Sequence, residues 1–209
     1  DFRLPPENPL TLVMGSVNWL MIIVLCLGFV GCEELDKTPS EIALKPGKFD
    51  IYDFAIYDTE TEKQIYLGMS KKEVDNILGE SVQDKIIKSK YSYNGLEIAY
   101  RNDKVVSIKI SSNDLDKYDR YITNRNIFIG SHKQDVITAY GIDWKAKQSG
   151  NYVILRKNNE FILLQNIKTI EDYKKYDTDD ILFISFLADT DNNINCISIC
   201  DYNYGMLLK

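Results

Sequence analysis

Histidine and cysteine are scarce in this chain, which has one His and four Cys among 209 residues. A zinc site of imidazole and thiolate ligands, or a nucleophile–histidine triad, therefore has little material. The single histidine, His132, stands where a helix is expected to begin, so we interpret it as a helix cap or an exposed side chain. The acidic segment from Asp189 lacks the Gly and Glu that a calcium loop needs at its sixth and twelfth places, and we interpret it as a hairpin turn. No cofactor and no metal is expected, although a metal site made of carboxylates stays open.

Positive charge is not in excess either, because 25 Lys and Arg stand against 31 Asp and Glu, for a net charge of −6. A protein that binds nucleic acid would need a basic face, so nucleic acid is not expected as a partner. One locally basic stretch, which we interpret as solvated surface rather than a phosphate or lipid site, contains Lys71, Lys72, Lys85, Lys88 and Lys90.

Two cysteines, Cys196 and Cys200, lie on one expected strand. Four residues of strand span about 13 Å, whereas a disulfide needs Cα atoms roughly 4.4–6.8 Å apart. We therefore expect two free thiols that are inert rather than catalytic.

Long apolar runs are limited to residues 19–31, which are followed directly by Cys32. This length suits the h-region of a secretory signal, roughly 7–15 residues, and is shorter than the ~20 that span a bilayer. Val30, Gly31 and Cys32 resemble a bacterial lipobox, in which a lipid is attached to the cysteine and the peptide is cut before it. We expect residues 1–31 to be a signal peptide, with Met14 as its true start.

An uncleaved membrane anchor over residues 10–31 is an alternative to this lipoprotein, and a cytosolic fate is a third. Both of the leading alternatives place the rest of the chain at the extracytoplasmic face of the cell membrane. Residues 32–48, with Pro39, Pro46 and Gly47, then form a lipidated tether.

A helix signal occurs twice in the remaining chain, at residues 65–79 and 127–141. In the first copy Ser70 and Glu73 form a capping box, Met69 and Val74 have the spacing of a hydrophobic staple, and Gly79 ends the helix. The second copy is offset by 62 positions. Residues 102–110 and 191–199 also match, at an offset of 89, so the second copy carries about 27 additional residues before its last strand.

The pattern predicts an α+β fold of two tandem units, each a short helix on one face of an antiparallel sheet of three to four strands. We assign residues 49–112 to the first unit, 113–126 to a connector and 127–209 to the second unit with its insertion. The expected strands are 49–57, 85–93, 96–100 and 105–110, then 152–155, 161–164, 181–187 and 194–199. Short helices are expected at 114–121 and 170–176.

Tyrosine is abundant, with 14 residues, and it serves protein interfaces because a large rigid ring carries a polar tip. We hypothesise a binding surface on the sheet faces opposite the helices, built from Tyr91, Tyr93, Tyr52 and Tyr57. The alternative for each of them is packing within the sheet.

The motif Gly68-Met69-Ser70, with Glu73-Val74 and Leu78-Gly79 and a hairpin ending in Val-x-Ser-Ile, resembles the module of β-lactamase-inhibitor-protein-like domains and SmpA/OmlA outer-membrane-assembly lipoproteins. This resemblance implies helix-on-sheet units, here in tandem, that bind other proteins rather than catalyse a reaction. We therefore expect an envelope lipoprotein that is a protein-binding or scaffold module and not an enzyme, with an unknown envelope or extracellular protein as its partner. The alternatives are a carboxylate-based hydrolase acting on cell-wall material and a binder of small or lipidic ligands.

Overall fold

A computed structural model describes residues 35, 37–114, 117–141, 144, 147–165, 167 and 169–207. The apolar run, the lipobox with Cys32 and the start of the predicted tether lie outside the described residues. Within the part that is described, no helix is long and apolar enough to cross a membrane.

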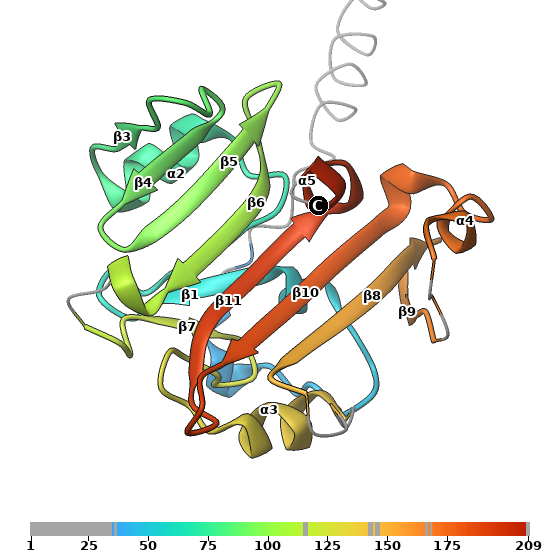
Figure 1. The fold of residues 1–209 in the computed structure, drawn as a ribbon. Helices are drawn as coiled ribbons and strands as arrows, with labels where there is room; N and C mark the ends of the chain where they lie inside the picture. The colour runs from blue at the N-terminus through green and yellow to red at the C-terminus, as the bar shows by residue number, and fades with distance from the viewer. Residues whose placement is uncertain are drawn as a thin grey trace, which may run out of the picture. The chain divides into compact units, whose positions relative to one another are not determined.

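The body is built from short helices and longer strands (Figure 1). The helices are α2 (Lys71–Leu78), α3 (Lys133–Tyr140), α4 (Ile170–Tyr173) and α5 (Tyr202–Leu207). The strands are β1 (Ala55–Asp58), β2 (Lys63–Tyr66), β3 (Val82–Gln83), β4 (Lys90–Tyr93), β5 (Leu96–Arg101), β6 (Lys104–Ser111), β7 (Tyr121–Thr123), β8 (Ser149–Lys157), β9 (Glu160–Leu163), β10 (Ile181–Ala188) and β11 (Ile194–Asp201).

The strands form two antiparallel sheets, which confirms the expected α+β class. One sheet has three strands in the order β2-β1-β7, and the other has eight in the order β3-β4-β5-β6-β11-β10-β8-β9. Each tandem unit contributes four strands to the larger sheet. The predicted strand at 49–57 is not one of them, because its last residues belong to β1 in the small sheet, and the unpredicted β3 takes the fourth place. The sequence did not show that the two sets join edge to edge through β6 and β11. We call residues 49–112 the first repeat and residues 127–207 the second repeat.

The β6–β11 seam relates the two repeats by an approximate two-fold axis. Ile108 pairs with Ile199 across the seam, and Ile110 pairs with Ile197. At the offset of 89, each of these pairs becomes the other when the repeats are exchanged. This is the isologous pairing of a symmetric dimer, found here within one chain.

The two long helices are held in the same way by three backbone hydrogen bonds each, which we call the helix clamp. In the first repeat these bonds run from Gly68 N to Val105 O (2.8 Å), Val105 N to Met69 O (2.9 Å) and Lys71 N to Asp103 O (3.0 Å). In the second repeat they run from Gly130 N to Ile194 O (2.7 Å), Ile194 N to Ser131 O (2.8 Å) and Lys133 N to Asn192 O (2.8 Å). Every donor and acceptor matches its counterpart at the offsets of 62 and 89.

The core lies on one side of the large sheet, which we call the inner face. Tyr93 on β4 donates a hydrogen bond from its hydroxyl to Asp75 of α2 at 2.7 Å, and the Tyr140 ring of α3 lies 5.0 Å from that of Phe186 on β10. The 3-10 helix that leads into the three-stranded sheet contacts the same face through Phe54, which stacks on Phe161 at 5.2 Å. Helices α2 and α3 therefore cover one face of the sheet, as predicted for a helix in each unit.

The connector and the chain before β1 differ from expectation. The helix predicted at residues 114–121 is absent from its described part, where a 3-10 turn at Ser112–Asp114 is followed by turns and then β7. β7 pairs with β1, so the connector adds a third strand to the small sheet. Residues 51–54, predicted as strand, form a 3-10 helix that Asp50 caps.

Two other boundaries also moved. The described part of the predicted tether, from Lys37 on, packs on the body: Pro39 is buried, and Gly47 N donates to Tyr140 O at 2.9 Å. The strand predicted at residues 85–93 begins only at Lys90, because Asp84 closes a turn over the preceding residues.

Candidate interaction surfaces

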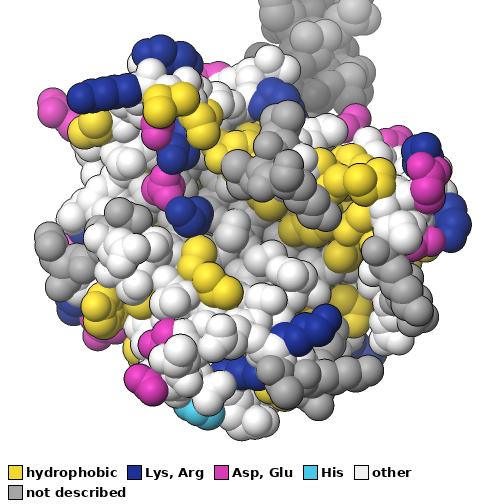
Figure 2. Space-filling view, viewed as in Figure 1, with side chains coloured by type: hydrophobic (Ala, Val, Ile, Leu, Met, Phe, Trp, Pro, Cys, Tyr) yellow, Lys and Arg dark blue, Asp and Glu magenta, His cyan; other side chains and the backbone are white. Residues whose placement is uncertain are grey.

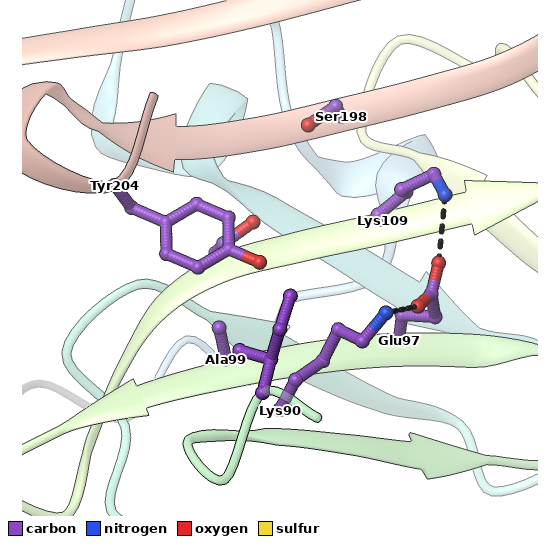
Figure 3. A pocket seen from close by; sticks show the side chains of 8 residues that line it. Lys90, Glu97, Ala99, Lys109, Ser198 and Tyr204 are labelled. Carbon is purple, nitrogen blue, oxygen red and sulfur yellow. Dashed lines mark hydrogen bonds and ion pairs between the residues drawn. The ribbon is translucent and has the colours of Figure 1, made fainter. Parts of the chain in front are cut away.

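The side of the large sheet that faces away from α2 and α3 forms a second surface, which we call the outer face. At its centre lies the pair that the two-fold axis maps onto itself, Lys109 of β6 opposite Ser198 of β11. Lys109 forms an ion pair with Glu97 at 2.7 Å, and Lys90 approaches the other oxygen of Glu97 at 2.6 Å (Figure 3). These three side chains form a chain of alternating charge along neighbouring strands.

The pairing fixes the protonation of this cluster. Burial opposes the ionisation of Glu97, but hydrogen bonds from Lys109 and Lys90 outweigh it and lower its pKa. The Glu97 carboxylate in turn raises the pKa of Lys90, against the effect of burial. A carboxyl group with a lowered pKa and a lysine with a raised one are a poor general acid and a poor nucleophile at neutral pH. The cluster is therefore suited to recognition rather than to proton transfer.

A shallow pocket of about 160 Å³ lies over this cluster. Its lining is Ile87, Lys90, Glu97, Ala99, Ser107, Lys109, Ser198 and Tyr204 (Figure 3). Pockets that hold drug-sized ligands enclose roughly 300–1,000 Å³, so this one is too small for such a ligand.

The second-repeat end of the outer face is apolar. Phe183 on β10 stacks with Tyr202 of α5, with ring centroids 6.2 Å apart, and Tyr173 of α4 approaches the same ring at 6.0 Å. Leu187, further along β10, stays 45% exposed. Figure 2 shows most of the charged side chains of this view over the β3–β6 region, with some hydrophobic ones among them, and a larger group of hydrophobic side chains over the upper part of β10 and β8.

Helix α5, which the sequence did not predict, covers part of this face. A Cβ at Gly205 would lie 3.2 Å from the Cys200 sulfur, so α5 approaches that cysteine closely. Burial raises the pKa of the Cys200 thiol to about 12, which leaves it protonated and unreactive at neutral pH. Cys196 and Cys200 form no disulfide, as predicted. Ser107 is buried opposite Cys200.

The four tyrosines proposed as a binding surface do not lie together on the outer face. Tyr91 pairs with Ile98 on the inner face, and Lys71 of α2 lies 4.5 Å from its ring. Tyr93 is fully buried there. Cross-strand register decides the face of a strand residue, and the sequence of β4 did not reveal it.

The other two tyrosines belong to the chain around the small sheet. Tyr57 is buried in β1, and Tyr52 is half-buried in the 3-10 helix before it, with Lys37 lying 5.8 Å from the ring. The four tyrosines therefore do not form one surface on the outer face, and the alternative of packing within the structure holds for Tyr93 and Tyr57. A binding role for Tyr91 and Tyr52 stays a prediction.

A larger groove of about 420 Å³ lies where strands of both repeats meet the small sheet, and we call it the seam groove. Apolar side chains in its lining include Phe54, Val106 and Leu182. Charged side chains of its lining are Arg101, Lys104, Arg156, Asp179 and Asp201. Arg101 pairs with Asp201, and Asn203 donates to Asp179 at 3.2 Å.

A buried ion pair that sequence reasoning missed joins Asp53, before β1, to Arg125, at the end of the connector. Arg125 donates to both carboxylate oxygens of Asp53, at 2.6 and 2.9 Å, and also to the carbonyl oxygens of Lys45, Lys48 and Ala139. All five N–H groups of the guanidinium are thus used. Asp53 lies 72 positions away in the sequence, so no local pattern could reveal the pair.

Two residues considered for metal binding have structural roles instead. His132 caps α3, where its Nδ1 accepts from Gln134 N at 3.2 Å. Asp189 accepts from the backbone N–H groups of Asp191 and Asn193 at 2.9 and 2.8 Å and so closes the β10–β11 hairpin. The cap and turn interpretations of these residues are confirmed. Within the described ranges, no cluster of three His, Cys, Asp or Glu side chains could hold a metal ion.

Comparison with known proteins gives no family. No family model matches the chain, and no curated protein matches it. Among solved structures, a cysteine-rich secretory protein from Staphylococcus aureus superposes with a TM-score of 0.39 and 11% sequence identity, over 78% of this chain and 50% of that one. The chain thus spans half the length of that protein. A similarity at this level assigns neither a family nor a function.

Proposed function

We propose that this chain is a cell-envelope lipoprotein, anchored at Cys32, whose body binds another protein through the outer face. One observation carries the proposal: a sheet face that no helix of the inner layer covers presents a charged end beside an apolar end. Protein interfaces combine these two kinds of surface, with apolar and aromatic groups at the centre and polar groups around them.

The outer face is prepared for such contact. Lys90 and Lys109 are balanced by Glu97 and Asp84 in one network of ion pairs, so a partner can approach them without burying an unpaired charge. The exposed Leu187 and the half-buried Phe183 supply apolar area on the neighbouring strands. The resemblance to lipoprotein modules that bind other proteins points in the same direction.

Site-specific crosslinking in intact cells tests this proposal. A photoreactive amino acid at Leu187 should crosslink to a specific protein, whereas the same residue at Ile170, which is 56% exposed on α4, should not. The substitution Leu187→Arg should weaken capture of the crosslinked protein at least tenfold. Crosslinks that are the same from both positions, or none from Leu187, would contradict the proposal. Cys32 found unmodified in the mature protein would remove the lipid anchor from it.

Binding of a small amphipathic ligand is a second candidate, which the seam groove favours. Its volume of about 420 Å³ lies within the range of ligand pockets, and its apolar floor is bordered by three basic side chains, Arg101, Lys104 and Arg156, and by two acidic ones, Asp179 and Asp201. A ligand with an apolar body and an anionic group fits this chemistry. A medium-chain fatty acid should raise the melting temperature of the chain, and this rise should be lost in Lys104→Glu. Both results together would support ligand binding in the seam groove.

The hydrolase alternative needs two carboxyl groups that face a substrate at about 5–9.5 Å. The acids of the outer-face pocket and the seam groove are Glu97, Asp179 and Asp201. Each of them is engaged by a cation or an amide, as described above. No contact of these acids favours hydrolysis over binding.

A further inference from the structure

The turn between β3 and β4 carries an unusual concentration of exposed apolar side chains. Ile86 is 90% exposed, Val82 74% and Ile87 39%. A single exposed apolar residue is normal on a protein surface, but three within six positions form an apolar patch of the kind that marks interaction sites. We call residues 82–88 the β3–β4 tip. It lies at the edge of the large sheet, at the upper left in Figure 1.

The β3–β4 tip is held rigidly in this exposed form. One carboxylate oxygen of Asp84 accepts from the backbone N–H groups of both Ile86 and Ile87, at 2.8 Å each. The Gln83 amide donates to Lys88 O at 2.6 Å and to the Tyr91 hydroxyl at 3.0 Å. Because the turn is already ordered, binding through Ile86 would cost little further conformational entropy.

The charges of the β3–β4 tip favour an anionic surface. Asp84 is matched by Lys90 at 3.1 Å, so its negative charge is compensated. Lys85 and Lys88 flank Ile86 and are exposed, with no ion pair to any residue that the structure describes. Glu80 is the other exposed acid nearby in the sequence. Figure 2 shows hydrophobic side chains among Lys and Arg side chains over this end of the sheet.

We propose that the β3–β4 tip docks on a lipid surface rich in anionic headgroups. Val82 and Ile86 enter the boundary between headgroups and acyl chains, and Lys85 and Lys88 pair with headgroup phosphates. This assigns to Lys85 and Lys88 the lipid contact that their sequence alone did not favour. The size of the patch decides between a membrane and a protein. A stable protein interface buries about 800 Å² on each partner, far more than three side chains on a turn supply.

A small patch is sufficient for a membrane contact when a second signal is present. A single lipid chain gives only marginal, reversible membrane binding, and stable attachment needs another apolar or basic element. This inference therefore rests on the membrane anchoring of the proposed function. The inference adds to this anchoring an orientation of the body, with the β3 edge against the bilayer.

Vesicle binding by the full chain tests this inference, with hydrogen exchange as a local measure. Vesicles of about 30% phosphatidylglycerol in phosphatidylcholine should protect the amides of residues 85–89, and vesicles of phosphatidylcholine should protect them little. Ile86→Glu, and separately the double variant Lys85→Glu/Lys88→Glu, should each remove this protection and weaken binding about tenfold. Ile170→Glu, the same substitution at an exposed isoleucine elsewhere on the surface, should change neither the protection nor the binding.

Three results would overturn the inference. The first is equal binding and equal protection in Ile86→Glu and the unsubstituted chain. The second is equal protection by the two kinds of vesicle. The third is protection that rises with protein concentration when no vesicles are present, which would assign the tip to self-association along the β3 edge. The N-terminal segment is the same in all variants, so its own membrane affinity cancels. Failure of the crosslink at Leu187 with tip protection intact would remove the proposed partner and leave this inference standing.

Discussion

The first repeat joins β4 to β5 through the two residues Asn94 and Gly95, whereas the second repeat places residues 158–180 between β8 and β10. This longer connection contains β9, α4 and a 3-10 turn. The helix clamp is nevertheless the same in both repeats, to within 0.2 Å for each hydrogen bond. The parts that the two repeats share are the helix, its clamp and the two strands nearest the seam. The outer strands and their connections are free to differ.

The repeats also differ in the contacts that they make with the chain before β1. Arg125 precedes the second helix signal by two residues, and its equivalent in the first repeat, Lys63, is exposed on β2. Arg125 uses this position to bind Asp53 and the backbone carbonyls of Lys45 and Lys48, in the chain before β1. The two equivalent positions therefore differ, because Arg125 carries a buried charge whereas the charge of Lys63 is exposed.

The largest expected effect follows from removing that charge. Arg125→Met should lower the free energy of unfolding by about 3–5 kcal/mol, because Asp53 is left buried without its partner. Lys63→Met, the matched change in the first repeat, should cost less than about 0.5 kcal/mol. Urea unfolding followed by tryptophan fluorescence measures both. Equal losses at the two positions would show that the repeats do not differ here.

The pH dependence of the Arg125→Met variant sharpens this test. Burial raises the pKa of Asp53 even with Arg125 present, and the loss of the guanidinium removes the contact that opposes this rise. A carboxyl group whose pKa is raised on folding contributes stability that is present below its unfolded pKa and is lost as the pH rises through the folded pKa. The variant should therefore recover stability as the pH falls from 7 toward about 4. The double variant Asp53→Asn/Arg125→Met should not show this recovery.

Much of the fold could be predicted because its signals are local. Alternating side chains predicted β5, β6, β10 and β11 to within a few residues, and Ser70 with Glu73 predicted the start of α2. What escaped prediction depends on partners that are distant in sequence: the β6–β11 seam, the Asp53–Arg125 pair and the face on which Tyr91 lies. A strand sequence gives the period of its side chains but neither its neighbour nor its register. The outer face was predicted as a surface, but the residues that form it were not.

Substitution of the helix-clamp glycine should lower stability by the same amount in the two repeats. Gly68 and Gly130 have φ angles of +90° and +97°, and nothing lies within 4 Å of a Cβ built at either position. Gly68→Ala and Gly130→Ala should each cost about 1–3 kcal/mol through backbone strain and differ by less than about 0.5 kcal/mol. Thermal unfolding of the two variants compares them directly. A clear inequality would mean that one repeat depends on its clamp and the other does not.

The helix caps should show a smaller difference, because the two repeats cap their helices differently. The Ser70 hydroxyl accepts from Glu73 N while Glu73 accepts from Ser70 N at 2.7 Å, and Met69 packs beside Val74 in the core. Ser70→Ala should cost about 1 kcal/mol. His132→Ser should be neutral or stabilising by a few tenths of a kcal/mol, since it gives the second helix the cap of the first. A loss of more than about 0.5 kcal/mol in His132→Ser would show that the imidazole does more than cap.

The smallest expected effect concerns the turn between β3 and β4 of the first repeat. In the second repeat the chain has already entered β8 at Ser149, the equivalent of Ile87. Hydrogen bonds from Ile87 N and Ile86 N, with Lys90 beside them, lower the pKa of Asp84 from 3.8 to about 2. A carboxyl group whose pKa is lowered on folding stabilises the turn above its ordinary pKa, and this contribution is lost as the pH falls from about 4 through about 2. Hydrogen exchange of the Ile86 and Ile87 amides should therefore accelerate in that range while the amides of β10 stay protected. Asp84→Asn should retain the turn but lose the acid transition, because its amide oxygen still accepts these hydrogen bonds and cannot titrate; an unchanged transition would show that another group closes the turn.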